Sequence, residues 1–88
     1  MARRVDPLDE ITAWIRQYPE RVGACAFMAA KAVARDDLSY RLVFDRCLSA
    51  AVDAGRSEAA ARLWVFRGFA AAAAGYPEPP AHLEESDD

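Results

Sequence analysis

The chain has 88 residues, a formal net charge of −3, two cysteines and one histidine. A chain of this length has room for a single small core, which excludes a multidomain enzyme. Hydrophobic residues make up 53% and charged residues 28%, which excludes a disordered chain, and two cysteines are too few for a disulfide scaffold.

Nothing in the sequence indicates export or insertion into a membrane. Basic residues at the N-terminus are followed by acidic ones, instead of the apolar segment of a signal peptide. The most apolar window, residues 63–74, is shorter than the roughly 20 residues that span a bilayer. We therefore expect a cytoplasmic protein with no membrane partner. Its 20 alanines, and its ten arginines against one lysine, are typical of a GC-rich bacterial or phage genome.

The first helix is predicted over residues 7–18. Asp6 is a suitable N-cap residue, and Pro7 suits the first helical position. Asp9 and Glu10 place negative charge in the first turn, where the helix dipole favours it. The apolar stripe predicted for the core consists of Leu8, Ile11, Trp14, Ile15 and Tyr18.

The second helix is predicted over residues 19–35, because Pro19 ends the first helix and suits the start of another. Phe27 lies on one side of this helix together with Lys31, where a core of four helices does not cover it. We therefore expect Phe27 to be exposed and to contact a partner. The opposite side, predicted to face the core, consists of Val22, Cys25, Ala26, Ala29 and Val33.

The third helix is predicted over residues 37–54, with Asp36 or Asp37 as its N-cap. Leu42 falls on its polar face near Asp45, so we expect Leu42 to be exposed. The stripe predicted for the core consists of Tyr40, Val43, Phe44, Cys47, Leu48 and Ala51.

The two cysteines are predicted to be neighbours in the core. If the second and third helices pack antiparallel around a turn near residue 36, Cys25 and Cys47 lie at the same height, each on an apolar face. Free cysteine commonly acts as a small buried hydrophobe, and a reducing cytosol disfavours a disulfide. We therefore expect two free thiols.

The fourth helix is predicted over residues 57–74, with Ser57 as its N-cap. Apart from Arg62 and Arg67 it is apolar around its whole circumference, which is typical of a helix at an interface or in the middle of a bundle. Its small residues let a partner helix approach closely. The face that we expect to pair with a second copy of the chain consists of Trp64, Gly68 and Ala71.

Residues 76–88 are rich in proline and acidic residues and are predicted to form a disordered acidic tail. They follow a single helical domain, residues 1–75. Residues 1–74 hold 11 basic and nine acidic residues, a balance of +2, so the tail makes the chain acidic. We expect its deletion to leave folding intact. The predicted fold is all-α, a compact bundle of four short helices, because neither strand alternation nor a repeat is present.

Enzyme chemistry is poorly supported by the residue types. His82 is the only imidazole and lies in the predicted tail, and neither cysteine has a histidine partner on the helical domain. The cysteines lack the spacing of a zinc site, and no glycine-rich phosphate loop is present. We therefore expect a protein that is not an enzyme and needs neither a metal nor a cofactor.

Direct nucleic-acid binding is the alternative function. Residues 47–63, a helix, a turn and a second helix, resemble a helix-turn-helix. The second helix of this segment begins with Glu58 and three alanines, which offer almost no side chain able to read a base edge. The ten arginines are spread over every predicted helix instead of forming one basic patch.

A helical protein-binding module is the function that the sequence favours, because four short helices cannot bury all of its apolar residues. In size and composition it looks like the small inhibitors of phages and mobile elements, for example anti-CRISPR proteins, which block a host nucleic-acid-handling complex. Acidic positions would then face a basic channel of the partner. The residues expected to bind a partner are Asp9, Glu10, Phe27, Asp36, Asp37, Leu42 and Asp45.

Overall fold

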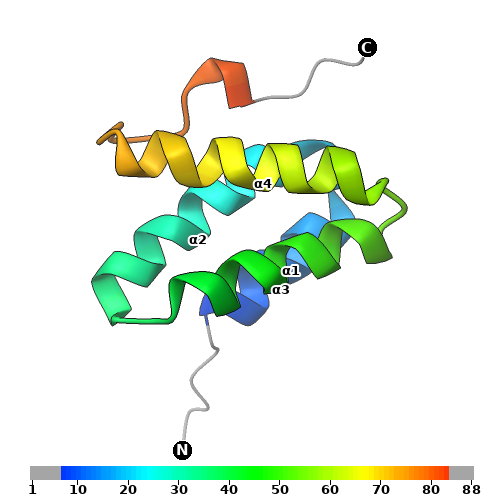
Figure 1. Ribbon diagram of the computed structural model, residues 1–88, viewed down its shortest axis with the longest axis horizontal. Coiled ribbons are helices and arrows are strands. Elements are labelled where there is room, and N and C mark those ends of the chain that lie inside the picture. The colour runs from blue at the N-terminus through cyan, green and yellow to red at the C-terminus, as the bar shows by residue number, and fades with distance from the viewer. Residues whose placement is uncertain (1–6, 84–88) are drawn as a thin grey trace, which may run out of the picture.

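The computed structural model describes residues 7–83 and confirms the all-α prediction (Figure 1). No strand occurs in this part of the chain. The expected cap Asp6 lies outside the described residues. Between residues 7 and 83, four α-helices and two 3-10 helices follow one another as α1 (Pro7–Gln17), η1 (Pro19–Arg21), α2 (Val22–Asp36), α3 (Tyr40–Asp53), α4 (Glu58–Ala73) and η2 (Ala81–Leu83).

The cap of α3 differs from the prediction. Ser39 is its N-cap, and the Ser39 hydroxyl oxygen accepts a hydrogen bond of 3.3 Å from the Leu42 backbone N–H. Asp37 instead closes α2, because it adopts the left-handed conformation with φ 55° and donates its N–H to the Val33 carbonyl. The cap predicted for α4 is confirmed, since the Ser57 hydroxyl accepts from the Ala60 N–H at 3.2 Å.

α2 lies at the centre of the arrangement and contacts each of the other three α-helices. In Figure 1, α4 runs along one side of the molecule, α1 and α3 run along the other, and α2 crosses between them. The contact between α2 and α4 is the most extensive. Two glycines allow it, because a Cβ atom on Gly68 would lie 2.8 Å from the Ala26 Cβ and would also overlap the Gly23 carbonyl oxygen.

The main core contains the apolar residues that helical spacing placed inside, with exceptions at its edges. Both cysteines belong to it, and the predicted face of α2 is buried except for Val33, which is partly buried. Trp14, Tyr18 and Tyr40 belong to predicted stripes and are nevertheless exposed. They lie at the ends of their helices or at the margins of the stripes, where a bundle this small has no further helix to cover them.

The chain returns to the helices after α4, where the sequence predicts a disordered tail. In Figure 1 the segment that ends in η2 folds back along α4. Leu83 is 0% exposed and packs with Phe27 and Ala71 in a second, smaller cluster. Gly23 makes room for it, because a Cβ atom there would lie 2.8 Å from the Leu83 carbonyl oxygen. Residues 84–88 of the predicted tail lie outside the described residues.

This return of the chain corrects the expectation that Phe27 is exposed. Phe27 is only 2% exposed, because Leu83 covers the side of α2 that the four helices alone leave open. Lys31, one turn later, lies with its Nζ atom 5.2 Å from the centre of the Phe27 ring. Phe27 therefore cannot contact a partner in this conformation.

Candidate functional site

An apolar groove of about 510 Å³ opens between α3 and α4, and we call it the α3–α4 groove. Phe66 is 61% exposed and Leu63 is 45% exposed, so two large apolar side chains project into solvent side by side on one helix. Residues lining this groove are Phe44, Ala59, Arg62, Leu63 and Phe66.

α4 creates this groove because it is apolar on two opposite faces. Its buried face consists of Ala61, Val65, Gly68, Phe69 and Ala71. Its exposed face carries a second set of apolar residues at alternating spacings of four and three, which places them in one line along the helix. This line, which we call the α4 stripe, consists of Ala59, Leu63, Phe66, Ala70 and Ala73.

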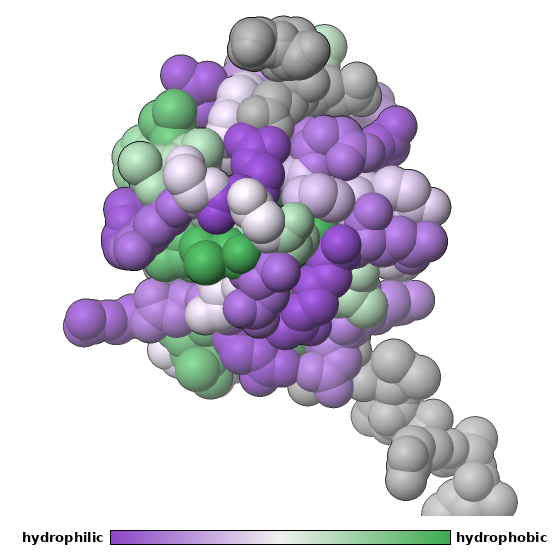
Figure 2. Space-filling model, turned by 90° about the vertical axis from the view of Figure 1, so that its right-hand side faces the viewer, coloured by the Kyte–Doolittle hydropathy of each residue, from purple (hydrophilic) through white to green (hydrophobic). Residues whose placement is uncertain are grey.

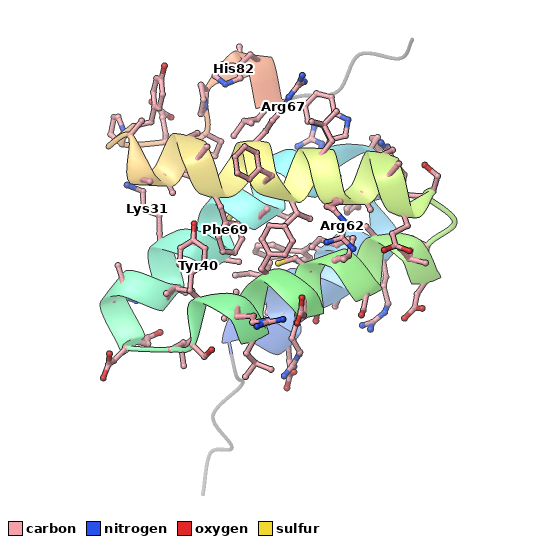
Figure 3. All side chains as sticks on the ribbon, viewed as in Figure 1. Lys31, Tyr40, Arg62, Arg67, Phe69 and His82 are labelled. Carbon is pink, nitrogen blue, oxygen red and sulfur yellow. The ribbon has the colours of Figure 1, made fainter. Side chains whose placement is uncertain are left out.

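A cluster of aromatic rings holds the floor of the groove in place. The Phe69 ring meets the Tyr40 ring edge to face with centroids 4.9 Å apart, and it meets the Phe44 ring at 5.4 Å. Figure 3 shows Tyr40 and Phe69 directed toward one another between α3 and α4. Because Phe69 is buried, Phe44 is fixed from behind and presents its remaining surface to the groove.

Arginines flank the α4 stripe on both sides. Arg62 lies between α4 and α3, whereas Arg67 lies on the far side of α4 (Figure 3). Arg62 forms an ion pair of 2.6 Å with Glu58, one helical turn earlier. The Arg67 guanidinium lies 4.8 Å from the centre of the Trp64 ring, which orients it by a cation–π contact.

The surface view shows the same contrast between apolar and charged residues. In Figure 2, hydrophobic residues show in the left-hand half of the view, which corresponds to the front of Figure 1, where α3 and α4 lie, and hydrophilic residues lie between and around them. An exposed apolar patch with a polar rim is typical of a protein interaction site.

A second, charged groove of about 340 Å³ lies between α1 and α3 and brings together three residues expected to bind a partner. Asp9, Leu42 and Asp45 all line it, and Leu42 is 54% exposed as expected. The Asp9 carboxylate accepts a hydrogen bond of 2.7 Å from Arg46, which also lines the groove. Asp9 therefore links α1 to α3. This contact within the chain is a role that the prediction of a partner-binding residue did not include.

The other acidic residues of the predicted site do not line this groove. Glu10 is exposed on α1, and Asp36 and Asp37 are exposed at the turn between α2 and α3. The Asp36 carboxylate lies 3.4 Å from the Arg35 Nε atom. Sequence reasoning therefore combined residues from separate parts of the surface.

The face expected to pair with a second copy is used within the chain. Gly68 and Ala71 are buried, Gly68 against α2 and Ala71 against Phe27 and Leu83. Trp64 is partly buried, and its ring limits the space at Gly23. The exposed residues are those of the opposite face, the α4 stripe, to which sequence reasoning assigned no role. Its regular spacing is the signal that could have found it.

The two cysteines are free thiols inside the core. Burial raises the pKa of Cys25 from 9.0 to about 11, an increase that Arg21 partly offsets. Burial, with a smaller contribution from the charge of Cys25, likewise raises the pKa of Cys47 to about 12. A neutral, buried thiol is a poor nucleophile and a poor metal ligand.

Within residues 7–83, no group of three or more His, Cys, Asp or Glu side chains is arranged so that it could hold a metal ion. Over the same range, no helix has both the length and the apolar character needed to cross a bilayer.

Comparison of the chain with protein-family models, with curated proteins and with solved structures gives no match in any of the three.

Proposed function

We propose that this protein is a helical protein-binding module without enzymatic activity, and that its contact surface is the α3–α4 groove. The observation that carries the proposal is the exposure of Phe66, 61%, beside Leu63 on a helix whose opposite face is fully packed. Covering a large aromatic side chain at the centre of an interface often contributes about 2 kcal/mol or more to binding. The groove supplies such an anchor together with a polar rim.

A more specific form of the proposal is an inhibitor that blocks a host nucleic-acid-handling complex, as small phage proteins do. Exposed carboxylates at Glu10 and Asp37 support this form, because they are available to basic residues of a partner, whereas the neighbouring Asp36 is also exposed but pairs with Arg35. The α1–α3 groove, with Leu42 and Asp45, offers a second contact for a partner large enough to reach around α3.

Direct binding to a DNA duplex is less well supported. As a recognition helix, α4 would present the apolar side chains Leu63 and Phe66 to the major groove, where hydrogen-bonding side chains read the bases. The measurement is the affinity for a generic duplex as salt increases. Binding that weakens steeply with salt, and that survives Phe66→Ser, would favour DNA over a protein partner.

The test of the proposal is affinity capture from cells of the source organism with three versions of the full chain. These are the native chain, Phe66→Ser and the control Met28→Ser, which alters an apolar residue that is also exposed but lies on α2. We expect one protein that binds the native chain and the control and that Phe66→Ser loses. Equal capture by all three, with all three folded by circular dichroism, would exclude the α3–α4 groove as the contact surface.

A further inference from the structure

We infer that the α3–α4 groove takes an amphipathic α-helix of a partner whose flanks are acidic. This inference rests on the proposed function and specifies the partner's shape and charge. Three features of the surface carry it: the spacing of the α4 stripe, the sizes of its residues and the sign of the charges beside it.

The spacing of the stripe is that of a coiled-coil seam. Positions 59, 63, 66, 70 and 73 alternate by four and three residues, the pattern with which one helix meets another along its length. All five residues are exposed. At 1.5 Å per residue the stripe spans about 21 Å, which matches a partner helix of about two heptads.

The sizes of the residues favour a helix over an irregular segment. Leu63 and Phe66 project near the middle of the stripe, whereas the positions toward its ends are alanines. Side chains of a partner helix can enter the spaces above Ala59 and Ala70, on either side of the Leu63 and Phe66 knobs. This is the knobs-into-holes arrangement, in which anchors recur at three- and four-residue intervals.

The charges beside the stripe select an acidic partner. Arg62 and Arg67 flank the two sides of the stripe, and Arg41 is exposed on α3 one turn before Phe44. Glu58 is the only acidic residue of α4, and it is paired with Arg62. Carboxylates along the flanks of a docked helix would meet Arg67, which the Trp64 ring already holds in position, and would share Arg62 with Glu58.

The same charges disfavour a second copy as the occupant of the groove. In an antiparallel pair with its two-fold axis at the middle of the stripe, Arg67 would lie close to Arg67 of the other copy. In a parallel pair, the side of α4 that carries Arg62 would meet the side that carries Arg67. Like charges placed in contact at an interface cost free energy and exclude wrong partners. A helix with basic flanks is disfavoured for the same reason.

The experiment uses two labelled synthetic helices of about three heptads, each with leucine at positions a and d. One carries glutamate at positions e and g, and the other carries lysine there. Fluorescence anisotropy with the full chain should show micromolar binding of the glutamate helix, weakening with salt, and at least about tenfold weaker binding of the lysine helix.

Phe66→Ser should weaken binding of the glutamate helix at least about tenfold, and Arg62→Gln with Arg67→Gln should weaken it severalfold. The control Met28→Ser should leave it unchanged.

Several outcomes would overturn the inference: equal or tighter binding of the lysine helix, no binding of either helix at about 1 mM, or full binding by Phe66→Ser. Sedimentation of the native chain alone measures whether it forms a dimer. A dimer that Phe66→Ser abolishes would identify a second copy as the occupant. Loss of a cellular partner by Phe66→Ser, together with failure of the glutamate helix to bind, would refute the acidic helix and leave the proposed function standing.

Discussion

Gly68 of α4 lies directly against Gly23 of α2, so close that a Cβ atom on Gly68 would overlap the Gly23 carbonyl oxygen. The same Cβ atom would lie 2.8 Å from the Phe27 backbone nitrogen. Backbone on both sides leaves no flexible side chain that could move away. The close approach of these two helices buries one face of α4 and leaves the α4 stripe outside.

Gly68→Ala is therefore expected to destabilise the protein by about 3 kcal/mol, because α2 and α4 must separate to admit the methyl group. Helix propensity alone acts in the opposite direction, since alanine is favoured over glycine by about 1 kcal/mol. Ala70→Gly, at an exposed position of the same helix, is the matched control and should cost about 1 kcal/mol. Urea unfolding followed by circular dichroism measures both, and a Gly68→Ala variant as stable as the native chain would contradict the close contact.

Leu83→Ala is expected to lower the free energy of unfolding by about 2–4 kcal/mol, because Leu83 is fully buried against Phe27. Ending the chain at Gly75 should cost at least as much and should expose Phe27 to solvent. Ala81→Ser, on the exposed side of η2, provides the control and should change stability by less than about 0.5 kcal/mol. A truncated chain with native stability would restore the expectation that the tail contributes nothing to folding.

The buried thiols predict a specific dependence on pH. The folded-state pKa values of about 11 for Cys25 and about 12 for Cys47 lie above the ordinary value of 9.0. The unfolded chain therefore releases protons above pH 9 that the folded chain retains, so stability is fully present below pH 9 and decreases as pH rises toward 11–12. Unfolding in urea at several pH values should show this decrease, and Cys47→Ala should make it less steep. An identical pH dependence in native and variant chains would contradict the burial of Cys47.

Thiol labelling gives an independent measurement of the same two side chains. At pH 8 the raised pKa leaves about 100-fold less thiolate at Cys25 than an exposed cysteine would have, and burial also blocks access of the reagent. We expect both thiols to react slowly in the folded protein and quickly in urea. Two equivalents should react after unfolding without reductant, whereas none would react if the cysteines formed a disulfide.

Ser39→Ala and Ser57→Ala are each expected to cost about 1 kcal/mol, because each removes the hydroxyl that accepts an N-terminal backbone N–H of its helix. Ser49→Ala is the control, since Ser49 is exposed within α3 and alanine is the better helix former there. Thermal unfolding of the three variants measures the difference. If Ser39→Ala leaves stability unchanged, Ser39 is not the N-cap of α3, and the result would favour Asp36 or Asp37 instead.

Local signals in the chain predicted the helices well. Pro7, Pro19 and Ser57 mark helix starts within a few residues of those in the structure. These signals act over one helical turn, because a cap or a proline affects backbone groups only three or four residues away. The cap of α3 was predicted wrongly because Asp37 and Ser39 both suit that position, and the left-handed conformation that ends α2 involves Asp37.

The proposed contact surface was harder to predict, because helical periodicity shows which residues share a face but does not show which face becomes buried. In α4 both faces are apolar, so the pattern alone does not show which of them is buried and which is exposed. The sequence placed the interface at Trp64, Gly68 and Ala71, and the structure uses that face to hold α2 and Leu83. The opposite face, with Phe66, remains open.

Composition and local periodicity thus account for the number, order and approximate bounds of the helices, because those depend on interactions within a few residues. The exposure of Phe66 and the burial of Phe27 depend on contacts between distant segments. Gly23 meets Gly68 across two helices, and Leu83 returns over Phe27 from beyond α4. No local signal reports these contacts, because they arise when whole helices pack and the free energy of the entire core selects one arrangement.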